Sequence, residues 1–76
     1  MELRVLTFGK IKELLGDDLL VPQVEDSGQL KEYLETRYPV LKTTKYVMAI
    51  DKNMVSGKVN VGKGSVVALL PPFSGG

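Results

Sequence analysis

The C-terminal run of the chain is the part whose residues suit chemistry better than packing. It reads Leu-Leu-Pro-Pro-Phe-Ser-Gly-Gly and ends at Gly76. Pro71 and Pro72 have φ fixed at about −65° and no amide hydrogen, so they cannot extend a sheet ladder and direct the chain away from it. Gly75 and Gly76 carry no Cβ, so a peptide ending there can thread a narrow channel. The sequence therefore predicts an extended tail, residues 71–76, that presents its carboxylate for reaction.

The composition leaves few other groups that could react. The chain has no Cys and no His, which removes disulfides, thiolate nucleophiles, imidazole bases and the usual zinc ligands. Its 76 residues form one domain that is too small to enclose an active site. We therefore expect no metal, no bound cofactor and no catalysis by this chain alone. A frayed terminus without function is the simplest alternative for the tail.

Charge and hydropathy exclude two classes of partner. Ten Lys and Arg against nine Asp and Glu give a net charge of +1, without a basic block that would attract nucleic acid. The start of the chain lacks the pattern of a signal peptide, and the longest apolar run, Val66–Leu70, is too short to cross a bilayer. We expect a cytoplasmic protein that binds neither nucleic acid nor a membrane.

The first part of the chain predicts a strand, a short helix and a returning strand. Alternation of β-forming residues favours a strand over 1–8, in which Leu3, Val5 and Thr7 share one face. Apolar residues after Gly9 recur at helical spacing until Gly16. The run 19–22 then predicts a second strand that returns as in a hairpin.

Residues 27–38 carry the strongest helical pattern. Asp26 or Ser27 can cap this helix, with Gln29 in the arrangement of a capping box. Pro39 disfavours helical geometry at Tyr38, so the helix should end there. One face is expected to pack on a sheet and carries Leu30, Tyr33, Leu34 and Tyr38. Three charged residues should point away from that face: Lys31, Glu32 and Glu35.

The second half of the chain predicts short strands separated by turns. A polar connector over 42–45 leads to a strand over 46–50, and turn-forming residues follow. Further short strands are expected at 54–55 and around Val59 and Val61, before a last strand over 65–70 that leads into the tail. This order predicts one α+β domain, residues 1–70, with the long helix across one face of its sheet.

Three segments resemble the MoaD-type sulfur carriers, the small subunits of molybdopterin synthase in the MoaD/ThiS ubiquitin-like family. The run 67–76 resembles that family's C-terminal signature. The run 8–16 resembles its first strand-to-helix segment, with Gly9 in place of the usual Ala and Lys12 in place of the usual Arg. The run 49–51 is a weaker match. The resemblance implies a β-grasp fold, which is a mixed sheet with one long helix packed across it, a second short helix, and the first and last strands parallel in the middle.

The resemblance also implies a reaction at Gly76. A carboxylate is a poor acyl donor because hydroxide is a poor leaving group, so an adenylate formed with ATP would be the activated form. A ubiquitin-activating-like adenylyltransferase would make that adenylate, and sulfur would convert it into a thiocarboxylate. The large subunit of molybdopterin synthase, in a heterotetramer, would then use the sulfur on cyclic pyranopterin monophosphate to build the molybdenum cofactor. The tail residues expected to enter that subunit are Pro71, Pro72, Phe73, Ser74 and Gly75.

A docking surface follows from the same resemblance. Phe8, Met54 and Leu70 occupy positions where the family presents apolar side chains to its partners, and Lys12 stands where the family usually has Arg. The alternative is that the three apolar residues are ordinary core. The turn at 62–65 lacks the acidic residues usual in relatives, so docking through charge at that loop is not expected.

Three other functions share some of these features. A sulfur carrier for the thiazole of thiamine has the same tail glycines, although it usually lacks the Pro-Pro pair. A protein modifier would use the same activated carboxylate to acylate a lysine amine. A plain interaction module would never have its tail activated.

Overall fold

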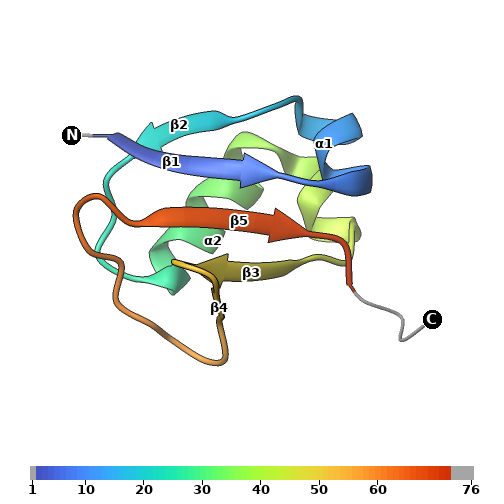
Figure 1. The fold of residues 1–76 in the computed structure, drawn as a ribbon. Helices are drawn as coiled ribbons and strands as arrows, with labels where there is room; N and C mark the ends of the chain where they lie inside the picture. The colour runs from blue at the N-terminus through green and yellow to red at the C-terminus, as the bar shows by residue number, and fades with distance from the viewer. Residues whose placement is uncertain (1, 73–76) are drawn as a thin grey trace.

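The computed structural model describes residues 2–72. The expectations for Met1, Phe73, Ser74, Gly75 and Gly76 therefore lie outside the described residues. The elements follow the predicted order (Figure 1), and they are β1 (Glu2–Thr7), α1 (Gly9–Leu15), β2 (Leu19–Pro22), α2 (Ser27–Arg37), a 3-10 helix η1 (Pro39–Thr43), β3 (Val47–Ile50), β4 (Asn53–Met54) and β5 (Val66–Leu70).

The strands form one mixed sheet in the order β2-β1-β5-β3-β4. β1 and β5 are parallel, whereas β1 with β2, β3 with β5 and β3 with β4 are antiparallel. The first and last strands therefore lie side by side within the sheet, as the resemblance implied. Between β1 and β5 the chain forms β2 beside β1, then α2 and η1 over one face of the sheet, and then β3 and β4 on the other side of β5 (Figure 1).

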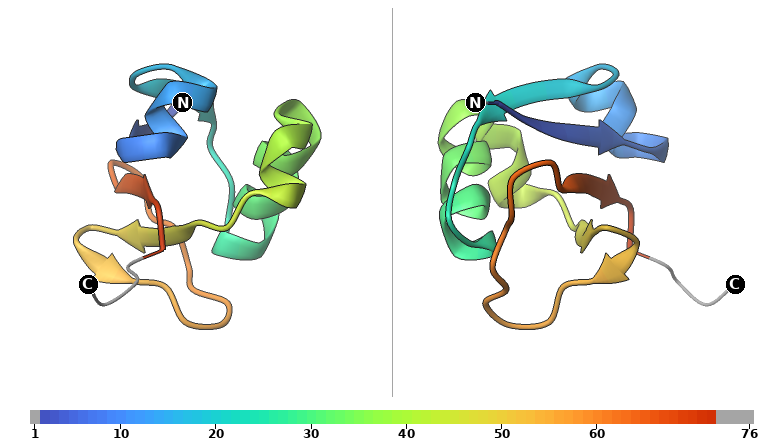
Figure 2. Two further views of the ribbon diagram at one scale, coloured as in Figure 1. Left: turned by 90° about the vertical axis from the view of Figure 1, so that its right-hand side faces the viewer. Right: turned by 60° about the vertical axis from the view of Figure 1, so that its left-hand side comes forward.

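The core lies between the sheet and α2. Leu30 and Leu34 of α2 are fully buried, and they pack with the alternate residues of the strands that face the helix. Figure 2 shows that α2 and η1 cover the same face of the sheet. The strand residues buried on this face are Leu3, Val5, Val21, Met48, Ile50, Val67 and Leu69. The predicted alternation of Leu3, Val5 and Thr7 is confirmed, since all three are buried.

The long helix is capped as predicted. The Asp26 side chain accepts a hydrogen bond from the Gln29 amide at 2.9 Å, and the Gln29 side chain accepts one from the Glu25 amide at 2.9 Å. This arrangement is a capping box in which the Gln29 side chain bonds the amide of Glu25, one residue before the N-cap, in place of the N-cap amide itself. The helix ends at Arg37, and Tyr38 is its C-cap, because Pro39 opens the 3-10 helix that follows.

The prediction of strands around Val59 and Val61 was wrong. This segment forms only one isolated bridge, between Asn60 and Asp26, and its hydrogen bonds go to the start of α2. The Ser27 amide donates to the Val59 carbonyl at 2.8 Å, and the Val61 amide donates to the Glu25 carbonyl at 2.9 Å. The alternating valines therefore correctly indicated side chains that pack on the core. The backbone of this segment, however, pairs with the residues at the start of α2 and not with the sheet.

The connector predicted at 42–45 is partly helical. η1 continues to Thr43, where the sequence predicted an irregular polar segment. The Thr44 hydroxyl donates to the Val40 carbonyl at 2.7 Å and closes this turn. Leu41 is the buried residue of this short helix, and its side chain anchors the turn in the core.

The turn between β3 and β4 places two non-glycine residues in the left-handed region of backbone conformation. Asp51 has φ of 48° and Lys52 has φ of 72°, as a two-residue turn of type I′ requires. The Asp51 carboxylate accepts from the Val66 amide at 3.0 Å and from the Ser65 hydroxyl at 3.1 Å. The side chain of Asp51 therefore connects the turn to the start of β5. Lys52 has the same strained backbone conformation without hydrogen bonds of this kind to offset it.

We expect Lys52→Gly to raise the free energy of unfolding by about 0.5–1 kcal/mol, because glycine adopts positive φ without a steric cost. Asp51→Gly is the matched control. It relieves the same strain but removes two hydrogen bonds, so it should be neutral or destabilising. Urea denaturation measures both variants, and a Lys52→Gly protein no more stable than wild type would contradict the assignment of strain to this residue.

Candidate functional site

The tail leaves the domain from the middle of the sheet. β5 lies between β1 and β3, and its last residue, Leu70, is followed by Pro71 and Pro72, which are both exposed. The ladder with β1 extends one residue past the strand, since the Phe8 amide donates to the Leu69 carbonyl at 3.1 Å. The start of the tail is therefore held against the end of β1 and the start of α1 (Figure 1).

Gly9 is the residue on which the first tail proline rests. Its φ is +54°, and a Cβ added there would lie 2.9 Å from Cγ and 3.3 Å from Cδ of Pro71. A side chain at this position would thus strain the backbone and collide with the proline ring. The sequence indicated Gly9 only as a break in the strand and a departure from the family's Ala. The contact with Pro71 joins residues 62 positions apart and could not be inferred from local pattern.

The side of the sheet opposite α2 carries many apolar side chains, beside the exposed Arg4. Cross-strand partners share a face, so Met54 opposite Ala49, and Leu70 opposite Val47, project on this side. We call this surface the open sheet face, and it comprises Leu6, Val47, Ala49, Met54, Val66, Ala68 and Leu70. Within the described part of the chain no helix covers it (Figure 2). Exposed apolar surface on one face of a sheet is typical of interaction sites.

The candidate interface residues lie in different environments. Met54 is 63% exposed and Phe8 is 44% exposed, so neither is a core residue, whereas Leu70 is half-buried on the open sheet face. Phe8 follows β1 in extended conformation, and alternation places it on the same side as Leu6. Lys12 is held elsewhere, because its Nζ lies 3.2 Å from Asp17 Oδ1 in an exposed ion pair of α1 and the turn after it.

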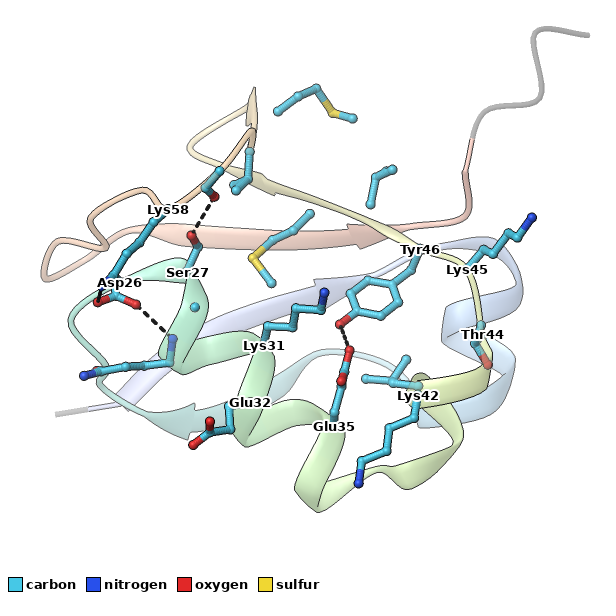
Figure 3. A pocket seen from close by; sticks show the side chains of 18 of the residues that line it. Asp26, Ser27, Lys31, Glu32, Glu35, Lys42, Thr44, Lys45, Tyr46 and Lys58 are labelled. Carbon is cyan, nitrogen blue, oxygen red and sulfur yellow. Dashed lines mark hydrogen bonds and ion pairs between the residues drawn. The ribbon is translucent and has the colours of Figure 1, made fainter.

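A groove separates the flank of α2 from the edge of β3 (Figure 3). Its volume is about 930 Å³, and Met48, Met54 and Val55 contribute its apolar surface. Lysine side chains from α2, η1 and the loop after β4 surround it. Sequence reasoning missed this groove because its walls come from segments that only the tertiary fold brings together.

Among the polar contacts around the groove is one between α2 and the residue before β3. The Tyr46 hydroxyl donates to Glu35 Oε2 at 2.9 Å (Figure 3). Burial raises the pKa of Tyr46 above its ordinary value, and the hydrogen bond and negative charge of Glu35 add to this effect, so the hydroxyl keeps its proton. The prediction that Glu35 points away from the sheet was therefore wrong. It occupies the edge of the helical face and reaches the strand beside it.

Residues 2–72 contain neither a membrane-spanning helix nor a cluster of metal-ligating side chains. No helix there is long and apolar enough to cross a membrane. No group of three or more acidic residues lies close enough together to hold a metal ion.

Comparison with known proteins gives a family and a fold. The model of the ThiS family matches residues 5–76. The fold resembles a chain of the protein–protein complex of subunits 1 and 2 of molybdopterin-converting factor from Helicobacter pylori 26695, with a TM-score of 0.73 over 100% of both chains and 20% sequence identity. A likeness at this identity concerns the fold, and it confirms the β-grasp prediction.

We expect Gly9→Ala to lower the free energy of unfolding by about 1–3 kcal/mol, from backbone strain and collision with Pro71 together. The variant Pro71→Ala removes the ring and separates the two causes. If the contact is real, the double variant should be more stable than the sum of the single effects predicts, because it no longer contains the collision. Strictly additive effects in urea denaturation would mean that the proline does not rest on Gly9.

Proposed function

Because the chain belongs to the ThiS family of ubiquitin-like sulfur carriers, we propose that it is the sulfur-carrying small subunit of a molybdopterin synthase. The observation that carries this proposal is the placement of the tail. Its first proline is seated on Gly9 at the end of the central strand, beside an uncovered apolar face. A partner bound to that face would receive the tail in a defined direction.

The proposed reaction uses the carboxylate of Gly76. An activating adenylyltransferase joins it to the α-phosphate of ATP and releases pyrophosphate, and a sulfur donor then displaces AMP, so that a C–S bond replaces the C–O bond. The resulting thiocarboxylate sulfur attacks a carbon of cyclic pyranopterin monophosphate on the large subunit, and the C–O bond at that carbon breaks as the C–S bond forms, so that the oxygen leaves with a proton. Water cleaves the acyl–sulfur bond and restores the carboxylate. This chain binds no cofactor in the scheme, since ATP is used on the activating enzyme.

The open sheet face supports a protein partner rather than a small molecule. It is a broad apolar surface around the tail root, whereas small ligands need a concave site that surrounds them. We propose that the large subunit docks here, in a heterotetramer formed in the cytoplasm. The Helicobacter pylori structure is of a complex between two subunits of its factor, and the activating enzyme would use the same tail in a separate encounter.

A second candidate is a sulfur carrier for the thiazole of thiamine, which the name of the matching family favours. The two candidates share activation at Gly76 and differ in the acceptor. Purified large subunit with pyranopterin, and a thiazole-forming system, can be supplied separately with the thiocarboxylated chain. Product in the pterin assay alone supports our proposal, and product in the thiazole assay alone replaces it.

The proposed reaction depends on the position of the terminal carboxylate. Deleting Gly76, or adding one residue after it, moves the carboxylate by about 3.5 Å along an extended backbone, which a near-attack geometry does not tolerate. We expect sulfur transfer to be abolished, and Gly75→Val and Gly76→Val to reduce it severely. Melting temperatures should not change, because these positions follow the last strand.

The assay is reconstitution with activating enzyme, ATP, a sulfur source and large subunit, with pterin product as readout. Intact mass reports separately whether one oxygen of the chain has been replaced by sulfur. Transfer at the wild-type rate after deletion of Gly76 would rule out the tail as the reactive element. Acylated lysines on other proteins would instead indicate a protein modifier, and lack of activation an interaction module.

Docking of the large subunit on the open sheet face can be tested by substitution. Phe8→Ala and Met54→Ala should weaken binding to the large subunit by tenfold or more, whereas stability should change by about 0.5 kcal/mol or less because both side chains are exposed. Leu70→Ala should affect both properties, since Leu70 is half-buried. Val40→Ala is the matched control, because Val40 is 41% exposed but lies in η1 on the opposite side of the sheet. Calorimetric titration and thermal melts separate the two effects, and equal losses for Val40→Ala would contradict the assignment.

A further inference from the structure

A small hollow lies at the start of the tail. Its volume is about 290 Å³, and the residues that line it are Lys10, Thr43, Thr44, Lys45, Pro71 and Pro72. They come from three separate parts of the fold, which are the first turn of α1, the end of η1 with the segment before β3, and the first two residues of the tail. A protein that takes up the tail has to lie against this hollow, because the tail itself forms one of its walls.

The antiparallel pairing of β3 with β5 places Lys45 beside the tail. Val47 is opposite Leu70 in that ladder, so counting the register two residues past the strand puts Lys45 level with Pro72. Figure 3 shows the Lys45 side chain on the side of the domain where β5 ends and the tail begins. The ammonium group of Lys45 is therefore next to the chain as it leaves the sheet.

A second lysine reaches the same hollow from the other neighbour of β5. α1 follows β1 and begins at Gly9, whose added Cβ would lie 2.9 Å from Cγ of Pro71. Lys10 is the next residue, and it lines the hollow together with Lys45. Because β5 lies between β1 and β3, the two lysines approach the tail from opposite sides.

The hollow carries positive charge without a compensating acid. None of the residues that line it is acidic, and among residues 2–72 no carboxylate lies at ion-pair distance from Lys10 or Lys45. Glu13 follows Lys10 by three residues on α1 and is not paired with it. Lys45 also borders the larger groove, but the Glu35 carboxylate there accepts the Tyr46 hydroxyl. This hollow therefore differs from the larger groove, whose rim carries both signs of charge.

The neutral polar groups of the hollow are already engaged. The hydroxyls of Thr43 and Thr44 both donate to the Val40 carbonyl, at 3.2 Å and 2.7 Å. Pro71 and Pro72 have no amide hydrogen to offer. Among these side chains and the two prolines, the donors left for an occupant are the ammonium groups, and their best acceptors are carboxylate oxygens.

We propose that Lys10 and Lys45 pair with carboxylate side chains of the large subunit, at the mouth of the channel that receives the tail. The inference rests on the proposed function, since it assigns a role to the same docking event. The mouth has to close around Pro71 and Pro72 for the end of the tail to reach an acceptor, so both lysines lose water on binding. An ammonium group that loses water without a counter-charge is costly. Acidic residues at the mouth remove that cost and attract the chain before contact.

The experiment measures the association rate constant of the full chain with the large subunit by stopped-flow fluorescence. Lys10→Glu and Lys45→Glu should each lower it about threefold or more in about 50 mM salt, and the double variant about tenfold, because steering by charge is strong at low ionic strength. The differences should shrink in about 0.5 M salt. Both side chains are exposed, so melting temperatures should not change.

Lys63→Glu is the matched control. It changes the net charge by the same amount, but Lys63 is exposed in the turn before β5, at the end of that strand away from the tail. We expect its association rate constant to stay within about twofold of wild type, because charge at that distance is largely screened.

The outcomes separate this inference from the proposed function. Wild-type rates for the Lys10 and Lys45 variants, or equal slowing by Lys63→Glu, would overturn the role of the two lysines, while sulfur transfer by the wild-type chain would still support the proposed function. Faster association of the variants would also overturn it, because it would indicate basic residues at the mouth. If the wild-type chain neither binds the large subunit nor passes sulfur to it, the proposed function fails and this inference fails with it.

Discussion

The parallel pairing of β1 with β5 is the interaction on which the rest of the structure depends. Because the two strands are parallel, the end of the first strand and the end of the last strand lie at the same end of the sheet. The hydrogen bond from Phe8 to Leu69 continues that pairing past the strand, so the start of α1 lies directly beside the start of the tail. Gly9 can then support Pro71. Residues near the N-terminus therefore set the direction in which the tail leaves the domain.

The long connection between β4 and β5 is held by polar contacts rather than by a strand. The Ser27 hydroxyl accepts from the Val59 amide at 2.9 Å and donates to the Gly57 carbonyl, while Val61 buries its side chain. At the other end, the Asp51 carboxylate receives the amide that opens β5. A domain this small has little apolar surface to bury. Two side chains that make two hydrogen bonds each, Ser27 and Asp51, therefore help to order a connection of this length.

The sheet offers two surfaces that differ in chemistry. The open sheet face is apolar and surrounds the tail root, which suits a partner that must bind the body and receive the tail together. The groove beside β3 is apolar inside and carries both lysines and carboxylates around its rim. Met54 stands where the two surfaces meet.

The sequence by itself determined the features that depend on neighbouring residues. These include the end of the last strand before Pro71, the alternation that buries Leu3 and Val5, and the cap at Asp26 with the stop before Pro39. Only the tertiary structure decided which residues meet across the fold. It exposed Met54, turned Glu35 toward Tyr46, opened the groove, and paired the segment of Val59 and Val61 with the approach to α2. The physical reason is that local propensity sets which backbone shapes a segment can adopt, whereas pairing partners and exposure are chosen by packing of distant segments.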